Sequence, residues 1–290
     1  MTLDISDYLG KVERQEEAPP DWNLPIDHWS PSSFAMLQRC PRQWQERYIH
    51  GRKERPAESI VVGSAVHVAV EMNFKQKIES HADVPTADLL DYYESAWPVV
   101  ISQQQENAGD DVLWDTDANE AGKRGRLMLA AYQNIVAPRI QPLAVETFVT
   151  VDVGLPIPIE GRFDVERDAS VIDLKSGKRA QRKPKEAWRI QGVVYGEARN
   201  KAVEFHSISA SQSSSKVTVV TPLESELLLI QPSWAERQSR LRILRALSDE
   251  ACFYMERYGP DEPWPPKGVY HDWACDYCGY RSDCPAWRAT

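Results

Sequence analysis

Two aspartates and a lysine stand close together in the middle of the chain, where their side chains could support metal-assisted chemistry. Asp164 ends the segment 161–164 (GRFD), and Asp173 and Lys175 belong to the segment 172–175 (IDLK). Carboxylate oxygens are the ligands that Mg²⁺ and Mn²⁺ prefer, and a lysine can contact a phosphate or hold an attacking water. Two carboxylates and a lysine are the minimum set for metal-assisted hydrolysis of a phosphodiester.

The pattern of these segments predicts a β-hairpin that forces the two aspartates together. Asp173 and Lys175 are two residues apart, so both side chains point to one face of their strand. A turn centred on 168–169 places Asp164 opposite Asp173. The apolar pairs of this register are Val165 with Ile172 and Phe163 with Leu174. Like charges placed opposite each other destabilise a strand pair unless a cation lies between them. The alternative interpretation is a solvated Asp-x-Lys pair on an edge strand, which is common.

A basic stretch follows the hairpin in a chain whose formal net charge is −9. That charge argues against indiscriminate nucleic-acid binding, so any nucleic-acid site has to be a local basic surface. The cationic residues of the stretch are Lys175, Lys178, Arg179, Arg182, Lys183, Lys185 and Arg189. They would attract a phosphodiester backbone without reading its sequence, although a solvated charged loop explains them as well.

Three further side chains on predicted helices could take part in the same site. Gln191 and Tyr195 lie four residues apart and project from one side of a helix, where they could contact a phosphate, a base or Lys175. A surface glutamine and a half-buried tyrosine explain this pair equally well. His67 is a lone histidine on a helix, and such residues are more often structural than catalytic.

Three of the five cysteines lie close together near the C-terminus, at Cys275, Cys278 and Cys284. In a reducing compartment this spacing indicates metal or cluster ligation rather than disulfides. The fourth ligand would be Cys40, which precedes a proline, or Cys252, which suits packing as a small hydrophobe on a helix. Four thiolates fit a 4Fe–4S cluster or a structural Zn²⁺, and the spacing does not separate the two.

The 290 residues are enough for one large domain or two modest ones, with an ample core. We predict a flexible arm at 1–28 and a single domain at 29–290. Its parts are a helical region at 29–142, a sheet core at 143–232, and a helix with the cysteine tail at 233–290. No apolar run approaches the roughly 18 residues of a membrane span, and the N-terminus lacks a secretory pattern, so we expect a cytoplasmic protein without membrane contact.

Caps, apolar periodicity and turn residues place the elements. Ser30 caps a helix that ends before Pro41, and Gly63 and Ser64 open another. The expected helices are 31–40, 42–49, 65–78, 86–106, 118–137, 184–200 and one that begins at a capping box at Ser233 and runs to Tyr258. The expected strands are 145–153, 157–166, 170–175, 203–209 and 216–221.

The order of these residues resembles the RecB-like branch of the PD-(D/E)XK nucleases over about 30–285. The matching positions are His67 on a helix, Glu146 before the hairpin, the GRFD and DLK segments, and Gln191-x-x-x-Tyr195. The cysteine pattern, one upstream and three at the C-terminus, resembles the iron–sulfur members of that branch. These include CRISPR-adaptation exonucleases, the AddB subunit of helicase–nucleases and phage exonucleases. Asp173 stands where many relatives have Glu, a variation that the family pattern allows.

The resemblance implies an α/β fold with a restriction-endonuclease-like mixed central sheet flanked by helices, and an iron–sulfur-stapled tail. The implied ligands of Mg²⁺ or Mn²⁺ are His67, Asp164, Asp173 and the backbone carbonyl of Leu174. Lys175 would orient the attacking hydroxide. The implied DNA contacts are Gln191 and Tyr195, to which the basic stretch adds Lys178, Arg179 and Arg182 as expected DNA-binding residues. The implied ligands of the 4Fe–4S cluster are Cys40, Cys275, Cys278 and Cys284. Glu146 could be functional or a structural ion-pair partner.

From the resemblance we expect a metal-dependent DNA exonuclease acting on single strands or frayed ends, in recombination, repair or phage DNA metabolism. The chain has no Gly-x4-Gly-Lys-Ser/Thr motif, so a helicase motor or another recombination protein would have to be a partner. A competing hypothesis is a non-catalytic DNA-binding adaptor stabilised by zinc or an iron–sulfur cluster. An iron–sulfur redox enzyme is disfavoured, because nothing resembles a flavin, nicotinamide or S-adenosylmethionine site.

Overall fold

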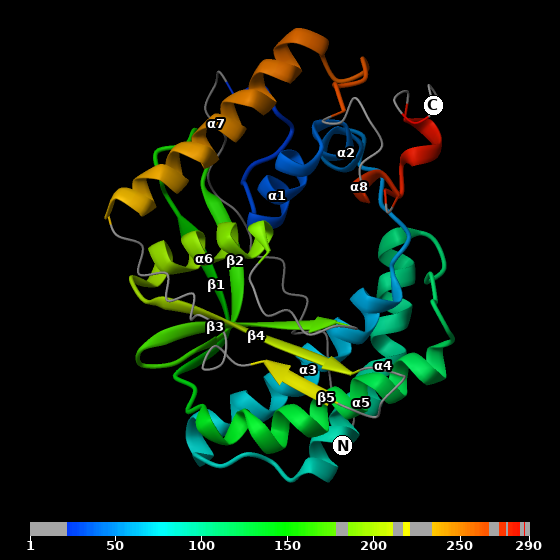
Figure 1. The fold of residues 1–290 in the computed structure, drawn as a ribbon, viewed down its shortest axis with the longest axis vertical. Helices are drawn as coiled ribbons and strands as arrows, with labels where there is room; N and C mark the ends of the chain where they lie inside the picture. Colours follow the sequence, from blue (N-terminus) through cyan, green and yellow to red (C-terminus); the bar gives the residue numbers. More distant parts are fainter. Residues whose placement is uncertain are drawn as a thin grey trace.

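A mixed sheet between two layers of helices forms the centre of the molecule (Figure 1). The computed structural model describes residues 22–177, 185–210, 217–220, 234–266, 273–276, 278–284 and 287. The strands are β1 (Ala144–Val151), β2 (Ile159–Glu166), β3 (Ser170–Gly177), β4 (Ala202–Ala210) and β5 (Val217–Val220). The helices are α1 (Pro31–Arg39), α2 (Pro41–Trp44), α3 (Glu58–Ser80), α4 (Thr86–Ala108), α5 (Ala118–Ile135), α6 (Glu186–Arg199), α7 (Trp234–Tyr258) and α8 (Trp273–Asp276). Shorter helical turns are η2 (Gln45–Ile49), η3 (Ala137–Arg139) and η4 (Arg281–Asp283). The α/β class and the mixed sheet flanked by helices are as the sequence predicted.

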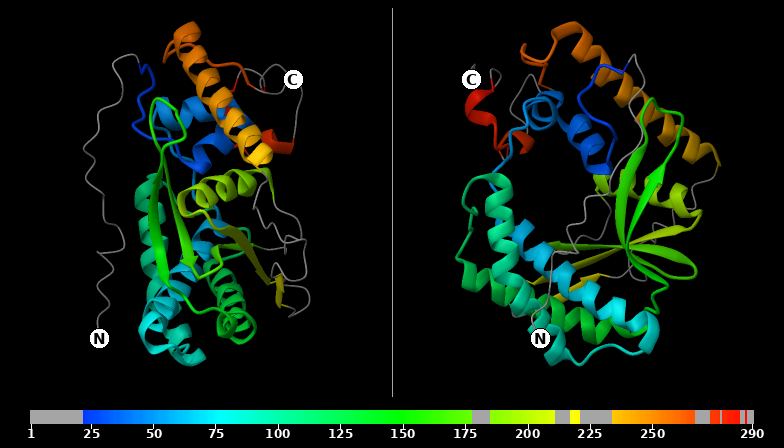
Figure 2. Two further views of the ribbon diagram at one scale, coloured as in Figure 1. Left: turned by 90° about the vertical axis from the view of Figure 1, so that its left-hand side faces the viewer. Right: turned by 180° about the vertical axis from the view of Figure 1, so that it is seen from behind.

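The strands follow the order β1-β2-β3-β4-β5, and β3 and β4 are the parallel pair. The other neighbours are antiparallel. Parallel strands need a crossover connection, and α6 supplies it between β3 and β4. The β1–β2 ribbon stands upright while β3, β4 and β5 run across it, so the sheet is strongly twisted (Figure 2). This twist separates β2 from β3 along part of their length.

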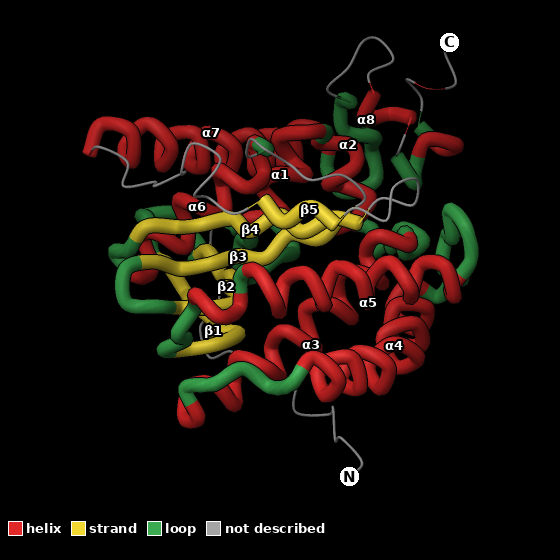
Figure 3. The backbone as a smooth tube through the Cα atoms, turned by 60° about the horizontal axis from the view of Figure 1, so that its bottom comes forward, coloured by secondary structure: helices red, strands yellow, loops and turns green. Residues whose placement is uncertain are grey.

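Each face of the sheet has its own hydrophobic core (Figure 3). On one face, α3, α4 and α5 supply residues such as Val66, Tyr93 and Leu129. On the other, α1, α6 and α7 supply residues such as Phe34 and Leu247. Fully burying one large apolar side chain contributes about 1.5–3 kcal/mol, so both layers are held firmly against the sheet. No described helix is long and apolar enough to cross a membrane.

The start of α1 follows the predicted cap, whereas the start of α3 does not follow the predicted one. Ser30 accepts a hydrogen bond from the Ser33 amide at 3.1 Å, as an N-cap serine should. Helix α3 begins at Glu58, so the expected opening at 63–64 is wrong. Gly63 lies inside the helix, at a point where α3 packs closely on β3. A Cβ at this position would approach Ser176 Oγ to 2.8 Å. The glycine therefore permits close packing of α3 on β3 and does not mark a helix end.

Glu58 fixes the true start of α3 through buried polar contacts. Its carboxylate pairs with Arg124 of α5 and accepts hydrogen bonds from the backbone amides of Asp115 and Thr116. Removing one partner of such a buried pair is costly, because the other charge stays buried without compensation. The contacts join the beginning of α3 to α5 and so fix the axis along which His67 is presented.

The remaining predicted elements agree with the structure within a few residues where it describes them. Helices α4, α5 and α6 and all five strands were expected, and α7 buries Leu241, Leu244, Leu247 and Ala251. The predicted cap at Ser233 lies outside the described residues. Of the arm predicted for 1–28, the described part from Trp22 packs against the core, with Leu24 buried.

Candidate active site

The hairpin of β2 and β3 has the predicted register only beside its turn. Val165 lies opposite Ile172 and Glu166 opposite Val171, and the ladder ends there. The predicted pairing of Phe163 with Leu174 is wrong, because β2 follows the twist of β1 and leaves β3. Phe163 packs with α1, α6 and α7, whereas Leu174 packs on the other face of the sheet.

The first carboxylate of the site occupies the opening between these two strands. The backbone amide of Leu174 donates a hydrogen bond to Asp164 Oδ2, in place of a bond to the β2 backbone. The N–H and C=O of a strand residue project to the same edge, so the Leu174 carbonyl also faces the β2 side. A buried backbone group and a partly buried carboxylate thereby satisfy each other where the ladder ends.

His67 and Glu146 approach Asp164 from a helix and from the neighbouring strand. His67 Nδ1 lies 3.1 Å from Asp164 Oδ1, and ligand atoms of His67, Glu146 and Asp164 all lie within 4.8 Å of one another. Glu146 stands between Val145 and Thr147, whose partners on β2 flank Asp164. Its φ of +49° is unusual for a non-glycine residue and breaks the regular strand at this point.

Asp173 and Lys175 form an ion pair next to this group. Asp173 is buried, and its carboxylate contacts the Lys175 ammonium, as their spacing of two on β3 predicts. Asp173 lines the same cavity as Asp164, but it is not one of the three residues whose ligand atoms converge. Of the expected metal ligands, the structure therefore brings His67 and Asp164 together, adds Glu146, and leaves Asp173 beside them with Lys175.

The titration of these groups shows how the charges are crowded. Burial and the charge of Asp164 raise the pKa of Glu146 to about 8. Burial, opposed by Lys175 and assisted by Asp164, raises the pKa of Asp173 to about 6. Burial opposes a charge on His67, but Asp164, Asp173 and Glu146 raise its pKa to about 9. Burial also acts to raise the pKa of Asp164, yet His67, the Leu174 amide and Lys175 lower it overall.

A cavity of about 430 Å³ opens over these groups, between α3, α4 and the strands. From α3 it is lined by Gly63, Ser64, His67, Val68 and Glu71; from α4 by Ala96, Val99, Val100, Gln103 and Gln104; from the strands by Glu146, Arg162, Asp164 and Asp173. Exposed Arg162 pairs with Glu146 at 2.8 Å, and Glu71 pairs with Lys75 at 2.8 Å. The contribution of α4 was not foreseen, because its sequence shows only an amphipathic helix.

Gln191 and Tyr195 act on the strands in this structure and do not face the cavity. Tyr195 is 3% exposed and donates a hydrogen bond to the Arg162 carbonyl at 2.8 Å. Gln191 hydrogen-bonds the same phenol. A Cβ on Gly161 would come within 2.8 Å of the Tyr195 ring, so this glycine admits the ring. This burial does not match the expected direct DNA contact by Tyr195. The Tyr195 hydroxyl instead supports the backbone of β2 at Arg162, two residues before Asp164.

Most of the predicted basic stretch, including Lys178, Arg179 and Arg182, lies outside the described residues. Lys185 is described, and its ammonium lies 5.9 Å from the centre of the Trp188 ring.

The described cysteines are all free thiols of intermediate exposure. Burial raises the pKa of Cys278, with smaller contributions from the nearby Glu54, Cys40 and Cys284. Cys40 and Cys284 each lie close enough to Cys278 to influence its thiol electrostatically. Within the described residues no three cysteine sulfurs lie within 4.8 Å of each other. A tetrahedral zinc site needs Zn–S distances of about 2.3 Å, so it is not preformed here.

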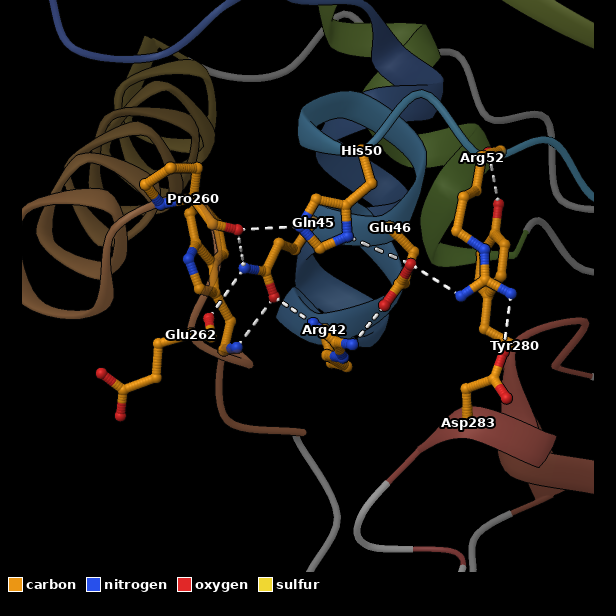
Figure 4. A network of polar contacts seen from close by, with 10 residues as sticks. Arg42, Gln45, Glu46, His50, Arg52, Pro260, Glu262, Tyr280 and Asp283 are labelled. Carbon is orange, nitrogen blue, oxygen red and sulfur yellow. Dashed lines mark hydrogen bonds and ion pairs between the residues drawn. The ribbon is translucent and has the colours of Figure 1, made fainter.

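A network of polar contacts holds the tail against the segment that follows Cys40 (Figure 4). Gln45 donates to the carbonyls of Pro260 and Glu262 at 2.9 Å, and Arg52 pairs with Asp283 at 2.7 Å. The Tyr280 hydroxyl donates to the Arg52 carbonyl at 2.8 Å. These contacts bring the cysteine tail back to the N-terminal helices.

Buried Glu46 is the centre of this network. Its carboxylate contacts Arg42, His50 and Arg52, the last at 3.0 Å. Burial raises the pKa of this carboxylate, but hydrogen bonds from His50 and Arg52 and the charge of Arg42 lower it overall. At Glu46 one acid has three basic partners, whereas at the sheet several acids lie close together.

The residues at the sheet fit a divalent cation. One imidazole and two carboxylates converge, and a backbone carbonyl faces the same edge. Nitrogen and oxygen donors of this kind suit Mg²⁺ or Mn²⁺ better than a soft metal that requires thiolates. The raised pKa values of Glu146 and Asp173 are those of carboxylates that lack enough positive charge nearby.

Comparison with known proteins found solved structures that are similar over much of the chain. The crystal structure of a "Putative exonuclease" from Eubacterium rectale is 13% identical, with a TM-score of 0.46, and the match covers 78% of this chain and 82% of that one. The crystal structure of SSO0001 is 18% identical, with a TM-score of 0.34, and the match covers 75% and 96% of the two chains.

No curated protein matches the sequence. Because both TM-scores are below 0.5, assignment rests on the family model for the PD-(D/E)XK nuclease superfamily, which matches residues 28–285. With the acidic cluster on β1, β2 and β3, this match over most of the chain establishes that the protein belongs to the PD-(D/E)XK nuclease superfamily.

Proposed function

We propose that this protein is a divalent-metal-dependent deoxyribonuclease that degrades single-stranded or frayed DNA from an end. The observation that carries the proposal is the convergence of His67, Glu146 and Asp164 within 4.8 Å, beside the Asp173–Lys175 pair. Membership in a nuclease superfamily supports the reaction class. The exonuclease mode and the preference for single strands are the finer parts of the proposal.

The residues of the chain divide the work of hydrolysis among them. His67, Glu146 and Asp164 would hold Mg²⁺ or Mn²⁺, with the Leu174 carbonyl as a further donor. A bound divalent cation supplies charge that polarises the phosphodiester and lowers the pKa of water. Lys175, whose ammonium pairs with Asp173, would donate hydrogen bonds to a phosphate oxygen and orient the attacking water.

Two further groups keep the substrate in register with these residues. Exposed Arg162 at the cavity can pair with a flanking phosphate, because its guanidinium is only partly engaged by Glu146. Tyr195 acts as a positioning residue through the backbone of Arg162. Both roles follow from the shape of the hairpin and need no contact between Tyr195 and DNA.

We also propose that Cys40, Cys275, Cys278 and Cys284 hold a 4Fe–4S cluster that stabilises the tail. The support is the proximity of Cys40 and Cys284 to Cys278, and the polar network that brings the tail to that place. Anaerobic purification, visible absorption, and iron and sulfide analysis test the cluster. The variant Cys278→Ser should lose the absorption, and the matched variant Cys252→Ser, which changes the thiol on α7, should keep it.

Product analysis on 5′- and 3′-labelled single strands, with Mg²⁺, Mn²⁺ or EDTA, tests the nuclease proposal. We expect cleavage with either metal, none with EDTA, and none by Asp173→Ala, while folding and DNA binding persist. Metal-dependent cleavage by Asp173→Ala at the wild-type rate would reject the site. Binding without cleavage by the wild type would favour the DNA-binding adaptor. Adding a helicase or recombination protein to the assay tests whether such a partner supplies the strand.

A further inference from the structure

Helix α4 presents two amide side chains to the cavity across from the acidic cluster. Gln103 and Gln104 line the same cavity as Asp164 and Asp173. Within the described part of the chain, neither amide has a hydrogen-bond partner. The next residue, Gln105, is different, because it donates to Asp111 Oδ1 at 3.0 Å and does not line the cavity. Two amides are thus available to a ligand in the cavity.

The rest of this wall is apolar and follows from the helical repeat. Ala96, Val99, Val100 and Gln103 are spaced three, four and seven residues from the first, so they share one face of α4. Pro98 stands inside the helix on its exposed side. The cavity therefore has two unlike sides, one of carboxylates on the strands and one of aliphatic groups with amides on α4.

We propose that this face of α4 (Val99, Val100, Gln103 and Gln104) binds the nucleoside of the nucleotide at the scissile phosphate, with the two amides contacting the edge of its base. The inference rests on the proposed nuclease function and names the part of the substrate that the cavity recognises. An amide both donates and accepts hydrogen bonds, as the edge of a base does. The α4 lining carries no cation, so it suits a sugar and base better than a phosphate.

The size of the cavity limits what can reach these amides. About 430 Å³ lies within the range of pockets that take one small ligand, and a base pair is two bases wide. Pairing occupies the Watson–Crick edge of a base, so only an unpaired base can offer that edge to Gln103 and Gln104. Recognition here therefore requires an unpaired nucleotide, as in other proteins that read single strands by the base edges.

The test compares the double variant Gln103→Ala/Gln104→Ala with Gln105→Ala, which removes the neighbouring amide outside the cavity. The substrates are a single-stranded oligonucleotide, the same strand with abasic nucleotides at its ends, and bis(p-nitrophenyl) phosphate, a diester without a base. We expect the double variant to lose about tenfold in kcat/KM on the normal strand, as loss of one or two neutral hydrogen bonds predicts. On the other two substrates, and for Gln105→Ala on all three, we expect wild-type rates.

Binding supplies a second readout that does not depend on cleavage. Fluorescence anisotropy of a labelled normal or abasic strand, with Ca²⁺ in place of Mg²⁺, should show weaker binding by the double variant for the normal strand only. Equal loss on normal and abasic strands, or no loss at all, would overturn the role of the amides even if cleavage is intact. Amide-dependent binding without any cleavage by the wild type would support the nucleoside site and reject the nuclease proposal.

Discussion

Two groups of buried carboxylates in this molecule are treated in opposite ways. In the tail network the single Glu46 carboxylate meets Arg42, His50 and Arg52, and its pKa is lowered despite burial. Over the sheet, Glu146 has Arg162 as an ion-pair partner but also lies near other acids, and burial together with the charge of Asp164 raises its pKa to about 8. The basic partners of Glu46 are enough to offset its burial. The basic partners of Glu146 are not enough to offset its burial and the charge of the neighbouring acids.

The difference separates a structural network from a functional one. Glu46 holds Arg52, which in turn pairs with Asp283 of the tail, and each of these contacts favours the folded state. The acids of the sheet converge at the expense of stability, because like charges in a buried place repel. Strongly raised pKa values in a cavity indicate a site arranged for chemistry, and a cation would remove the repulsion.

The largest expected effect is the loss of activity when the central acid of the sheet is neutralised. Asp164→Asn keeps the hydrogen bond from the Leu174 amide within reach but removes the negative charge. Since a metal ion supplies several kcal/mol of transition-state stabilisation, kcat/KM should fall by roughly a thousandfold. Single-turnover cleavage of a labelled strand measures it, with circular dichroism to show that the fold persists. Near wild-type cleavage would remove Asp164 from the site.

Neutralising Glu46 should affect stability and leave the chemistry intact. Glu46→Gln leaves Arg42 without its anion and Arg52 with Asp283 alone, and breaking a buried pair in this way costs about 3 to 5 kcal/mol. Urea denaturation measures the change. The control is Glu94→Gln, which breaks the exposed pair with Arg126 and should cost about 0 to 1 kcal/mol. Equal costs for the two variants would contradict the comparison.

Glu204 is another buried acid, and we expect it to stabilise the fold as Glu46 does. The pH dependence of the free energy of unfolding tests this. Burial raises the pKa of Glu204, but hydrogen bonds from His206, Ser170 and Arg167 lower it to about 2. Because the folded pKa is below the ordinary value of 4.5, its stabilisation is present above pH 4.5 and is lost as pH falls toward 2.

Glu204→Gln should therefore lower the free energy of unfolding by roughly 3 kcal/mol at pH 6. The difference from the wild type should shrink steadily below pH 4.5. Denaturation at a series of pH values measures this difference, and a penalty that is the same at pH 6 and pH 3 would exclude the assignment.

The smallest expected effect is the stabilisation by metal, and it sharpens the comparison most directly. At a concentration one hundred times the dissociation constant, Mn²⁺ should add about 2.7 kcal/mol to the free energy of unfolding. The gain should vanish in Glu146→Gln and persist in Glu46→Gln. Thermal denaturation with and without Mn²⁺ measures it. A shift in Glu146→Gln equal to that of the wild type would place the cation elsewhere.

The hairpin illustrates what the sequence could predict. The register at Val165 and Ile172 followed from alternating apolar residues and a turn signal, which are local properties. The separation of the strands beyond Val165 was not predictable, because it depends on the twist that β1 imposes on β2. For the same reason the sequence left the role of Glu146 open between a functional residue and an ion-pair partner. Its role depends on which residue of β1 lies beside Asp164.

Other features depend on contacts between elements distant in sequence. The start of α3 was misplaced because Gly63 resembles a helix boundary locally, whereas its small size serves the contact with Ser176. The role of Gln103 and Gln104 required the position of α4 over the sheet. Tyr195 was recognised as part of the site from its spacing to Gln191, but its burial, which decides its role, is a tertiary property.

The change of face along the β1–β2 ribbon has a consequence for cooperativity. Val145 and Val165 contact the core of α3, α4 and α5, whereas Val149 and Phe163 belong to the core of α1, α6 and α7. The acids Glu146 and Asp164 stand at the crossing between the two cores. Neither layer can loosen without moving a ligand oxygen, so we expect heat inactivation to coincide with global unfolding and no half of the chain to retain a working centre.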